Sequence, residues 1–227
     1  MRILALALAV LAGPTLAEVS VSPRILAARL AEPTDRYGHA VLGETPEWGA
    51  IQIDTVRGSV TIRLPETRVF EDIEARLADL DGDGGPEVIV VESDLSLGAS
   101  LAVYGPKGKI AATQFIGQSN RWLAPAGIAD FDGDGRVEIA YVDRPHLLGE
   151  LVYVRLEGDR LVETLRLPGL TNHRIGDDFI SGGVRDCGKG PELILASKDW
   201  SRVLRVRDGV SEDIGPMPVG ALTVPAC

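Results

Sequence analysis

Residues 79–91 read DLDGDGGPEVIVV, and residues 130–142 read DFDGDGRVEIAYV. In both stretches, acidic residues occupy positions 1, 3, 5 and 9, glycine occupies positions 4 and 6, and four mostly apolar residues follow. A weaker copy, DCGKGPELIL, begins at residue 186, and a fainter one, GETPEWGAI, spans residues 43–51. Recurrence of one pattern along the chain indicates a repeat architecture.

Two sets of acidic residues mark the length of the repeat. The glutamates that precede the apolar stretches are spaced 40, 51 and 54 residues apart, and a second acid recurs near the end of each stretch. The two sets are Glu47, Glu87, Glu138 and Glu192, and Asp54, Asp94, Asp143 and Asp199. This spacing predicts four units, at approximately residues 35–72, 73–118, 119–170 and 171–214, within a single domain of residues 18–227.

Each unit is predicted to contain four strands separated by glycine and proline turns. In the second unit we expect strands at 75–80, 87–92, 100–104 and 109–115, and in the third at 127–131, 138–142, 150–156 and 160–167. Four short strands per repeat of this length are typical of a propeller blade. We therefore expect an all-β fold, a small β-propeller of about four blades, each a four-stranded antiparallel sheet. A sandwich of about 16 strands is the alternative, but it does not explain why the same loop recurs before each second strand. Residues 25–30 are expected to add a strand to the last blade and to close the ring.

The acidic loops are predicted to bind cations. Four carboxylates this close together repel one another, and a pair 4 Å apart costs about 4 kcal/mol at an effective dielectric constant near 20. Oxygen ligands without nearby histidine or cysteine favour calcium, although a metal-free Asp-Gly turn is the alternative. An EF-hand is excluded because its bidentate glutamate is replaced by Val90 and Tyr141. The predicted ligands of two calcium ions, between first and second strands, are Asp79, Asp81, Asp83, Glu87 and the Gly85 carbonyl, and Asp130, Asp132, Asp134, Glu138 and the Arg136 carbonyl. In the weaker copy, Val184 and Gly188 replace two acids and Lys189 replaces a glycine, so no metal is expected there.

The loops at residues 79–87 and 130–138, each leading into an apolar strand, resemble those of FG-GAP and VCBS-type repeat proteins. That family is similar to the N-terminal β-propeller of integrin α chains. The resemblance implies a propeller whose blade loops bind calcium. The chain lacks the Phe-Gly and Gly-Ala-Pro strings of the namesake repeat, and it has fewer units than the seven blades typical of integrins.

A second group of residues is a candidate ligand site. Polar residues precede the first strand of successive units, and a ring would bring them together at the central channel as a cationic patch for an anionic ligand. These candidates are Arg68, Asn120, Arg121, Asn172, His173 and Arg174. Alternatively, each arginine pairs with a recurrent acid, such as Asp94 or Asp143, and braces its own blade. The three tryptophans either line a carbohydrate platform or pack between blades.

The N-terminus is predicted to be a signal peptide of residues 1–17. Arg2 precedes ten apolar residues, and Thr15-Leu16-Ala17 supplies small residues at the positions that a signal peptidase reads; a buried helix is the alternative. The apolar run is too short to span a membrane, so no membrane span is expected. In an exported protein, Cys187 and Cys227 most simply form one disulfide, the alternative being two separate thiols.

Composition narrows the function. The 227 residues include 33 acidic and 23 basic ones, a net charge of −10, which argues against a nucleic-acid partner. We expect a secreted or periplasmic, calcium-stabilised β-propeller that acts as an interaction module for a protein or glycan ligand. The alternative is a small propeller hydrolase that acts on an anionic substrate at the central channel. No catalytic residue is assigned.

Overall fold

The computed structural model describes residues 22–227, and this part of the chain consists of strands, turns and loops without a helix. The expected signal peptide lies outside the described residues, and no helix able to cross a membrane occurs among them. The strands are β1 (Ile25–Thr34), β2 (Glu47–Thr55), β3 (Gly58–Arg63), β4 (Arg68–Phe70), β5 (Arg76–Ala78), β6 (Glu87–Asp94), β7 (Gly98–Gly105), β8 (Gly108–Ala112), β9 (Leu123–Ala129), β10 (Glu138–Asp143), β11 (Glu150–Glu157), β12 (Arg160–Pro168), β13 (Leu170–Thr171), β14 (Gly183–Asp186), β15 (Pro191–Ser197), β16 (Arg202–Arg207) and β17 (Val210–Pro216). The all-β prediction is confirmed, and the strands expected in the second and third units are present with small shifts at their ends.

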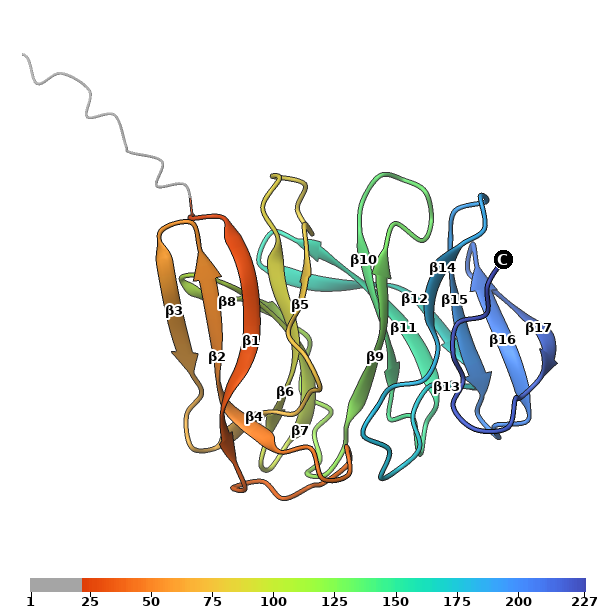
Figure 1. Cartoon of the computed structure of the whole chain (residues 1–227), viewed down its shortest axis with the longest axis horizontal. Coiled ribbons are helices and arrows are strands. Elements are labelled where there is room, and N and C mark those ends of the chain that lie inside the picture. Colours follow the sequence, from red (N-terminus) through yellow and green to blue (C-terminus); the bar gives the residue numbers. More distant parts are fainter. Residues whose placement is uncertain (1–21) are drawn as a thin grey trace, which may run out of the picture.

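The strands form three antiparallel sheets, which comprise β1–β8, β9–β12 and β13–β17. The first sheet bends at β4, which pairs with β2 on one side and with β6 on the other. Four groups of strands therefore lie side by side in a row, from β1–β3 at one end to β14–β17 at the other (Figure 1). Within residues 22–227, no strand pairing joins the two ends of this row.

Alternation of side chains explains how the groups stack. In β6, Ile89 and Val91 pack with residues of β10 and β11, whereas Val88 and Val90 pack with residues of β2. Successive side chains of a strand point to opposite faces, so a strand that is apolar at every position can be buried on both sides. All eight residues of β6 are buried. The apolar part of β6 is residues 88–91, whereas Glu87, Glu92, Ser93 and Asp94 of the same strand are buried polar groups. Full burial of one large apolar side chain is worth about 1.5–3 kcal/mol.

The two ends of the row are finished differently. The last sheet packs Ile194 and Ala196 against Leu222 and Val224 of the C-terminal tail. The tail is held by the Cys187–Cys227 disulfide, which confirms the predicted pairing. At the other end, the outer face of the first group is polar. There Asp54 accepts hydrogen bonds from Arg29, Gln52 and Ser59.

Residues 25–30 do not complete the last blade, contrary to expectation. They belong to β1, which pairs with β2, and Leu30 lies opposite Ile51. The strand β2 is close to β1 along the chain and pairs with it on the side opposite β3, whereas one face of the last sheet is already covered by the tail. The start of β1 at Ile25 lines the same hollow as Asp81, so the β1–β2 loop lies at the end of the strands opposite the acidic loops.

Candidate functional site

The loops of residues 79–87 and 130–138 have the same local structure. In each loop, the acid at position 1 accepts a hydrogen bond from the backbone amide of position 6. The acids at positions 3 and 5 each accept one from the backbone amide two residues further along the chain. The closing glutamate accepts from the backbone of position 2, Leu80 in one loop and Phe131 in the other, at 2.9 Å in both. The repeated acids thus hold the loop closed through their own backbone, as short acidic side chains do in turns.

Glycine at position 6 is required by this conformation. Gly84 and Gly135 have φ of 89° and 87°, a region that residues with a Cβ atom rarely adopt. Both glycine amides donate to the first acid of their loop, Asp79 and Asp130. Glycine therefore recurs at position 6 because the backbone conformation that brings the carboxylates together requires a positive φ there.

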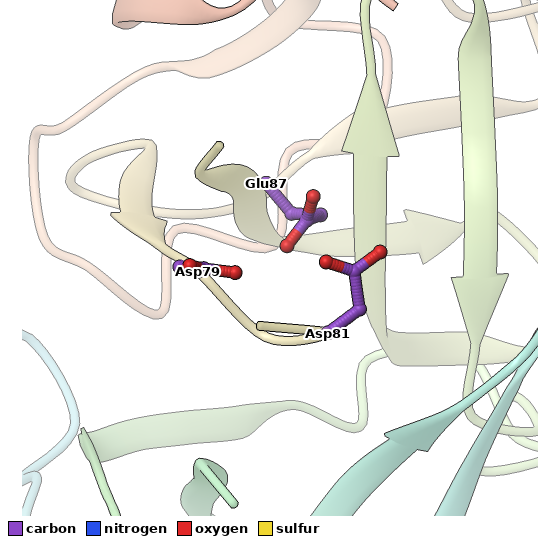
Figure 2. A group of neighbouring side chains, drawn as sticks. All are labelled: Asp79, Asp81 and Glu87. Carbon is purple, nitrogen blue, oxygen red and sulfur yellow. The ribbon is translucent and has the colours of Figure 1, made fainter. Parts of the chain in front are cut away.

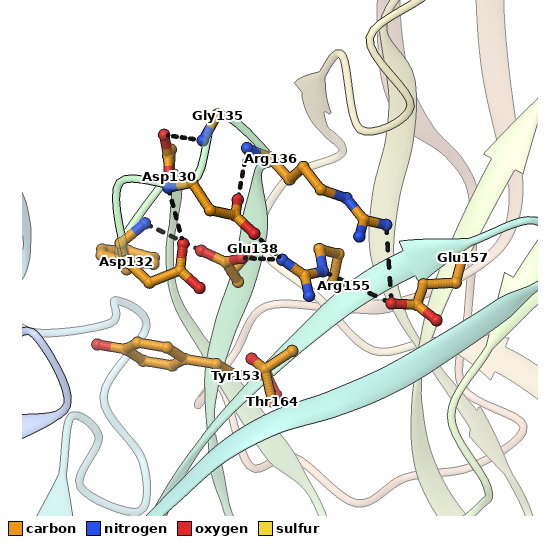
Figure 3. Close-up of polar contacts among 11 residues, drawn as sticks. Asp130, Asp132, Gly135, Arg136, Glu138, Tyr153, Arg155, Glu157 and Thr164 are labelled. Atoms are coloured by element: carbon orange, nitrogen blue, oxygen red, sulfur yellow. Dashed lines mark hydrogen bonds and ion pairs between the residues drawn. The ribbon is translucent and has the colours of Figure 1, made fainter.

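Three carboxylates converge in each loop. Ligand atoms of Asp79, Asp81 and Glu87 lie within 4.8 Å of one another, and their side chains point toward a common centre (Figure 2). Asp130, Asp132 and Glu138 form the equivalent cluster in the second loop (Figure 3). In both clusters the glutamate is buried and comes from the start of a second strand, which fixes its position.

The clustered charges repel one another. Burial, together with the charges of Asp81, Asp83 and Asp79, raises the pKa of Glu87 to about 7. Burial also raises the pKa of Glu138, and the neighbouring Asp132 adds to the effect. A cation at the centre of either cluster would offset both causes, because it attracts the charged form of every carboxylate.

The fifth-position acids are not part of these clusters. Asp83 accepts a hydrogen bond from the Gly85 amide, and Asp134 accepts one from the Arg136 amide and pairs with Arg155. The Arg136 amide and the Arg155 guanidinium hold the pKa of Asp134 below its usual range. Their role as calcium ligands, like that of the Gly85 and Arg136 carbonyls, stays a prediction.

The available donors fit a hard cation. Each cluster offers only carboxylate oxygens, the ligand type that calcium prefers. In the second cluster, Asp130 Oδ1 is buried and accepts no hydrogen bond from the described residues. A buried carboxylate oxygen without a donor is costly, and a bound cation would satisfy it.

In the fourth copy, arginines stand where the loops place acids around a cation. Glu192 pairs with Arg185 at 2.7 Å, Arg207 at 3.2 Å and Arg205 at 3.7 Å. No metal was expected in this copy, in which Lys189 stands in place of the glycine. The charges around Glu192 are those of arginines, which project toward the glutamate from β14 and β16, the two strands that pair with β15.

Strand register shows which residue lies opposite the closing glutamate in each of three copies of the loop. Arg155 lies opposite Glu138 in the β10–β11 pair. Continuing the neighbouring ladders places Gly105 opposite Glu87 and Arg207 opposite Glu192. The residue facing the closing glutamate is therefore glycine in the first acidic loop and arginine in the other two copies.

This series predicts unequal cation affinity. Arg155 Nη1 lies 3.5 Å from Glu138 (Figure 3) and 2.6 Å from Asp134, so its charge would compete with a bound cation. The R155Q variant should bind calcium at the 130–138 loop about tenfold more tightly, about 1.4 kcal/mol, as measured by calorimetric titration. The reciprocal variant G105R should weaken the 79–87 loop. Unchanged affinities in both variants would show that the facing residue is irrelevant.

The candidate ligand residues do not form one patch. Arg68 braces its own unit by pairing with Glu92 and Asp94, as the alternative interpretation held. Asn172 is buried and donates to Ala124 and Pro125, and Arg174 lies over the Trp200 ring. Only Asn120, Arg121 and, behind the pocket wall, His173 lie around a common hollow.

That hollow is a pocket of about 310 Å³ at the end of the strands opposite the acidic loops. It is lined by His39, Val41, Asn120, Arg121, Trp122, Arg144, His146, Leu147 and Ile175. Behind its wall, His39 Nδ1 lies 2.6 Å from the buried Glu71, and the Ser93 hydroxyl donates to the same carboxyl group. Because the serine binds the acid rather than the imidazole, this trio does not form the nucleophile–base pair that a hydrolase needs. Sequence reasoning missed His39 and Glu71, which are 32 residues apart and outside the repeated pattern.

Two histidines, His146 and His173, are hydrogen-bonded to each other beside this pocket. His173 Nε2 lies 2.9 Å from the Asp177 carbonyl oxygen, so it carries the proton. Neutral His173 then accepts at Nδ1 from His146 Nε2, also at 2.9 Å. Burial, with His173 as the next cause, lowers the pKa of His146 to about 4, and burial also lowers that of His173.

Acid should therefore destabilise this region. In the unfolded chain His146 takes up a proton near pH 6.5, whereas in the folded chain it resists until about pH 4. Its stabilising contribution is complete above pH 6.5 and is lost as the pH falls toward 4. Between pH 7 and 4.5 the wild type should lose about 2 kcal/mol more than H146Q, measured by urea unfolding. Comparing slopes cancels the carboxylates common to both proteins, and parallel curves would contradict the prediction.

Comparison with known proteins identifies one repeat. Residues 79–141 match the family model of the FG-GAP-like repeat, which begins at the first acidic loop and includes the second. The match confirms, for residues 79–141, the resemblance to FG-GAP-type repeats seen in the sequence. No curated protein and no solved structure matches the chain significantly.

Proposed function

We propose that this chain is an exported, calcium-stabilised, β-propeller-like interaction module whose two acidic loops each hold one calcium ion. One observation carries the proposal: two loops in neighbouring groups of strands bring three carboxylates together in the same geometry. Without a cation, such clusters are destabilised by repulsion between the carboxylates and by burial of the glutamate, and a surface turn does not need them. The FG-GAP-like repeat over the same residues supports this interpretation.

Export is part of the same proposal. The Cys187–Cys227 disulfide is consistent with an oxidising compartment, either extracellular or periplasmic. Calcium sites of low affinity, with dissociation constants of about 10⁻⁴ to 10⁻³ M, would be filled outside the cell and empty in the cytosol. The partner in this proposal is a protein or glycan, because stacked sheets offer broad loop surfaces. The contacts among Ser93, Glu71 and His39 do not support a hydrolase, because the serine hydroxyl donates to the acid and not to the imidazole.

Calorimetric titration tests the metal sites. The wild type should bind two calcium ions per chain, D81A or D132A one, and the double variant none. Asp81 and Asp132 are exposed members of their clusters, so their substitution should leave the strands intact. The variant D159A, at an exposed aspartate outside both loops, serves as the charge control and should still bind two ions. Failure of the wild type to bind calcium at millimolar concentration would reject the proposed sites.

Partner binding needs a separate test. Glycan and peptide arrays should be probed with wild type in calcium, with wild type in chelator, and with the D81A/D132A variant. A partner of the folded module should be retained in calcium and lost in the other two samples. Uniform binding in all three would mean that calcium does not support the interaction surface.

A further inference from the structure

We propose that the pocket lined by His39, Arg121 and Leu147 binds a small carboxylic acid that carries an apolar group. The pocket is built from segments distant in the sequence: the β1–β2 loop, the approach to β9, the β10–β11 loop and Ile175. It lies at the end of the strands opposite the acidic loops, so this inference is independent of calcium and goes beyond the proposed interaction with a macromolecule. Its volume of about 310 Å³ is at the lower end for ligand pockets, which suits a small molecule.

The positive charge of the pocket comes from Arg121. Among residues 22–227, no carboxylate pairs with Arg121, whose Nη1 donates only to the Asn120 carbonyl. The other arginine in the lining, Arg144, is already neutralised by Asp143 through two contacts of 2.9 and 2.8 Å. An arginine without an acid partner, on a chain with a net charge of −10, is a specific attraction for an anion.

No acid in the pocket lining opposes this charge. Glu71 lies behind His39, is 2% exposed, and is engaged by both His39 and Ser93. His146 donates its Nε2 proton to His173, as shown above, and burial lowers its pKa, so it contributes no positive charge at neutral pH. The planar guanidinium of Arg121 matches a carboxylate, which can accept two parallel hydrogen bonds.

The apolar group of the ligand is specified by the pocket rim. Leu147 and Ile175 line the pocket and are 55% and 73% exposed, whereas most large apolar side chains of this protein are buried. Val41 adds a buried apolar wall. A ligand with an aromatic or branched aliphatic group would cover these side chains while its carboxylate reached Arg121.

A sugar is a poorer fit for the same pocket. Trp122, the aromatic residue of the lining besides the two histidines, is 2% exposed, donates its indole proton to the Glu71 carbonyl, and packs against His146 and His173. Its ring therefore presents no free face on which a sugar could stack.

The test uses three related probes on the full chain in calcium buffer: 3-phenylpropanoate, its neutral amide 3-phenylpropanamide, and propanoate, which lacks the ring. Affinities are measured by calorimetry, and the Trp122 indole N–H signal in nitrogen-correlated NMR locates the binding. The acid with the ring should bind at least tenfold more tightly than either of the other two, because each lacks one of the two recognised groups. R121Q should reduce its affinity about tenfold, and I175S about threefold.

R160Q is the matched control, because it removes the same charge from an exposed arginine on β12 outside the pocket. It should leave affinity unchanged. Equal affinity for the acid and the amide, equal loss in R121Q and R160Q, or no saturable binding would overturn the proposal. The I175S variant changes an exposed side chain and so keeps the test valid if R121Q folds poorly. Loss of calcium binding with intact probe binding would reject only the calcium proposal, and the reverse result would reject only the pocket.

Discussion

Saturating calcium should raise the free energy of unfolding of this protein by about 5 kcal/mol. A ligand present at one hundred times its dissociation constant stabilises the native state by about 2.7 kcal/mol per site, and the two loops provide two sites. The gain has a structural basis, because each cluster holds a buried glutamate, Glu87 or Glu138, whose pKa is raised in the absence of a cation. Urea unfolding in calcium and in chelator measures the difference.

The control for calcium is the D81A/D132A variant, which should show the same stability in both buffers. Magnesium at equal ionic strength should stabilise the wild type much less, because it keeps its water and demands stricter geometry. Identical unfolding curves of the wild type with and without chelator would rule out a stabilising role for calcium, even if ions bind.

The E192A substitution should cost about 3–5 kcal/mol without affecting either calcium site. Glu192 is 1% exposed and lies among Arg185, Arg205 and Arg207, so its removal leaves guanidinium groups partly buried without their counter-charge. Removing one partner of a buried ion pair is far more costly than the pair is stabilising. Thermal or urea unfolding in calcium measures the loss.

The comparison for E192A is E212A. Glu212 pairs with Arg205, but its side chain is 60% exposed, so its loss should cost less than about 1 kcal/mol. Both variants remove one negative charge from the same sheet. Equal effects would mean that Glu192 contributes only surface electrostatics and does not replace a metal-centred cluster.

Much of this structure could be predicted because the strands are unusually explicit. Residues 87–91 and 138–142 are short apolar stretches that begin with an acid and follow glycine turns, and both stretches form buried strands. The cysteine pairing followed from there being only two cysteines. In the acidic loops, spacing indicated the carboxylates at positions 1, 3 and 9 that meet in each cluster, but it also included the position-5 acids Asp83 and Asp134, which lie outside the clusters.

Long-range placement could not be read in this way. The strand predicted at residues 25–30 is present within β1, but its predicted partner was wrong, since strand pairing depends on which edge is free. Similarly, the 43–47 pattern resembles the acidic loops, yet the loop that contains it lies at the opposite end of the strands. The His39–Glu71 contact joins two loops through a single pair of atoms, and no repeating pattern in the sequence predicts such a contact.

The tail that covers the last sheet has a consequence for the reduced chain. If the Cys187–Cys227 disulfide were reduced, the segment containing Leu222 could detach from the last sheet. The apolar face at Ile194 would then be exposed to solvent. The far end of the row cannot receive that face, because it presents Arg29 and Asp54 to solvent. Two reduced molecules would therefore associate through their exposed Ile194 faces into a symmetric dimer. Such a dimer leaves no apolar face free, so the molecules would not assemble into fibres.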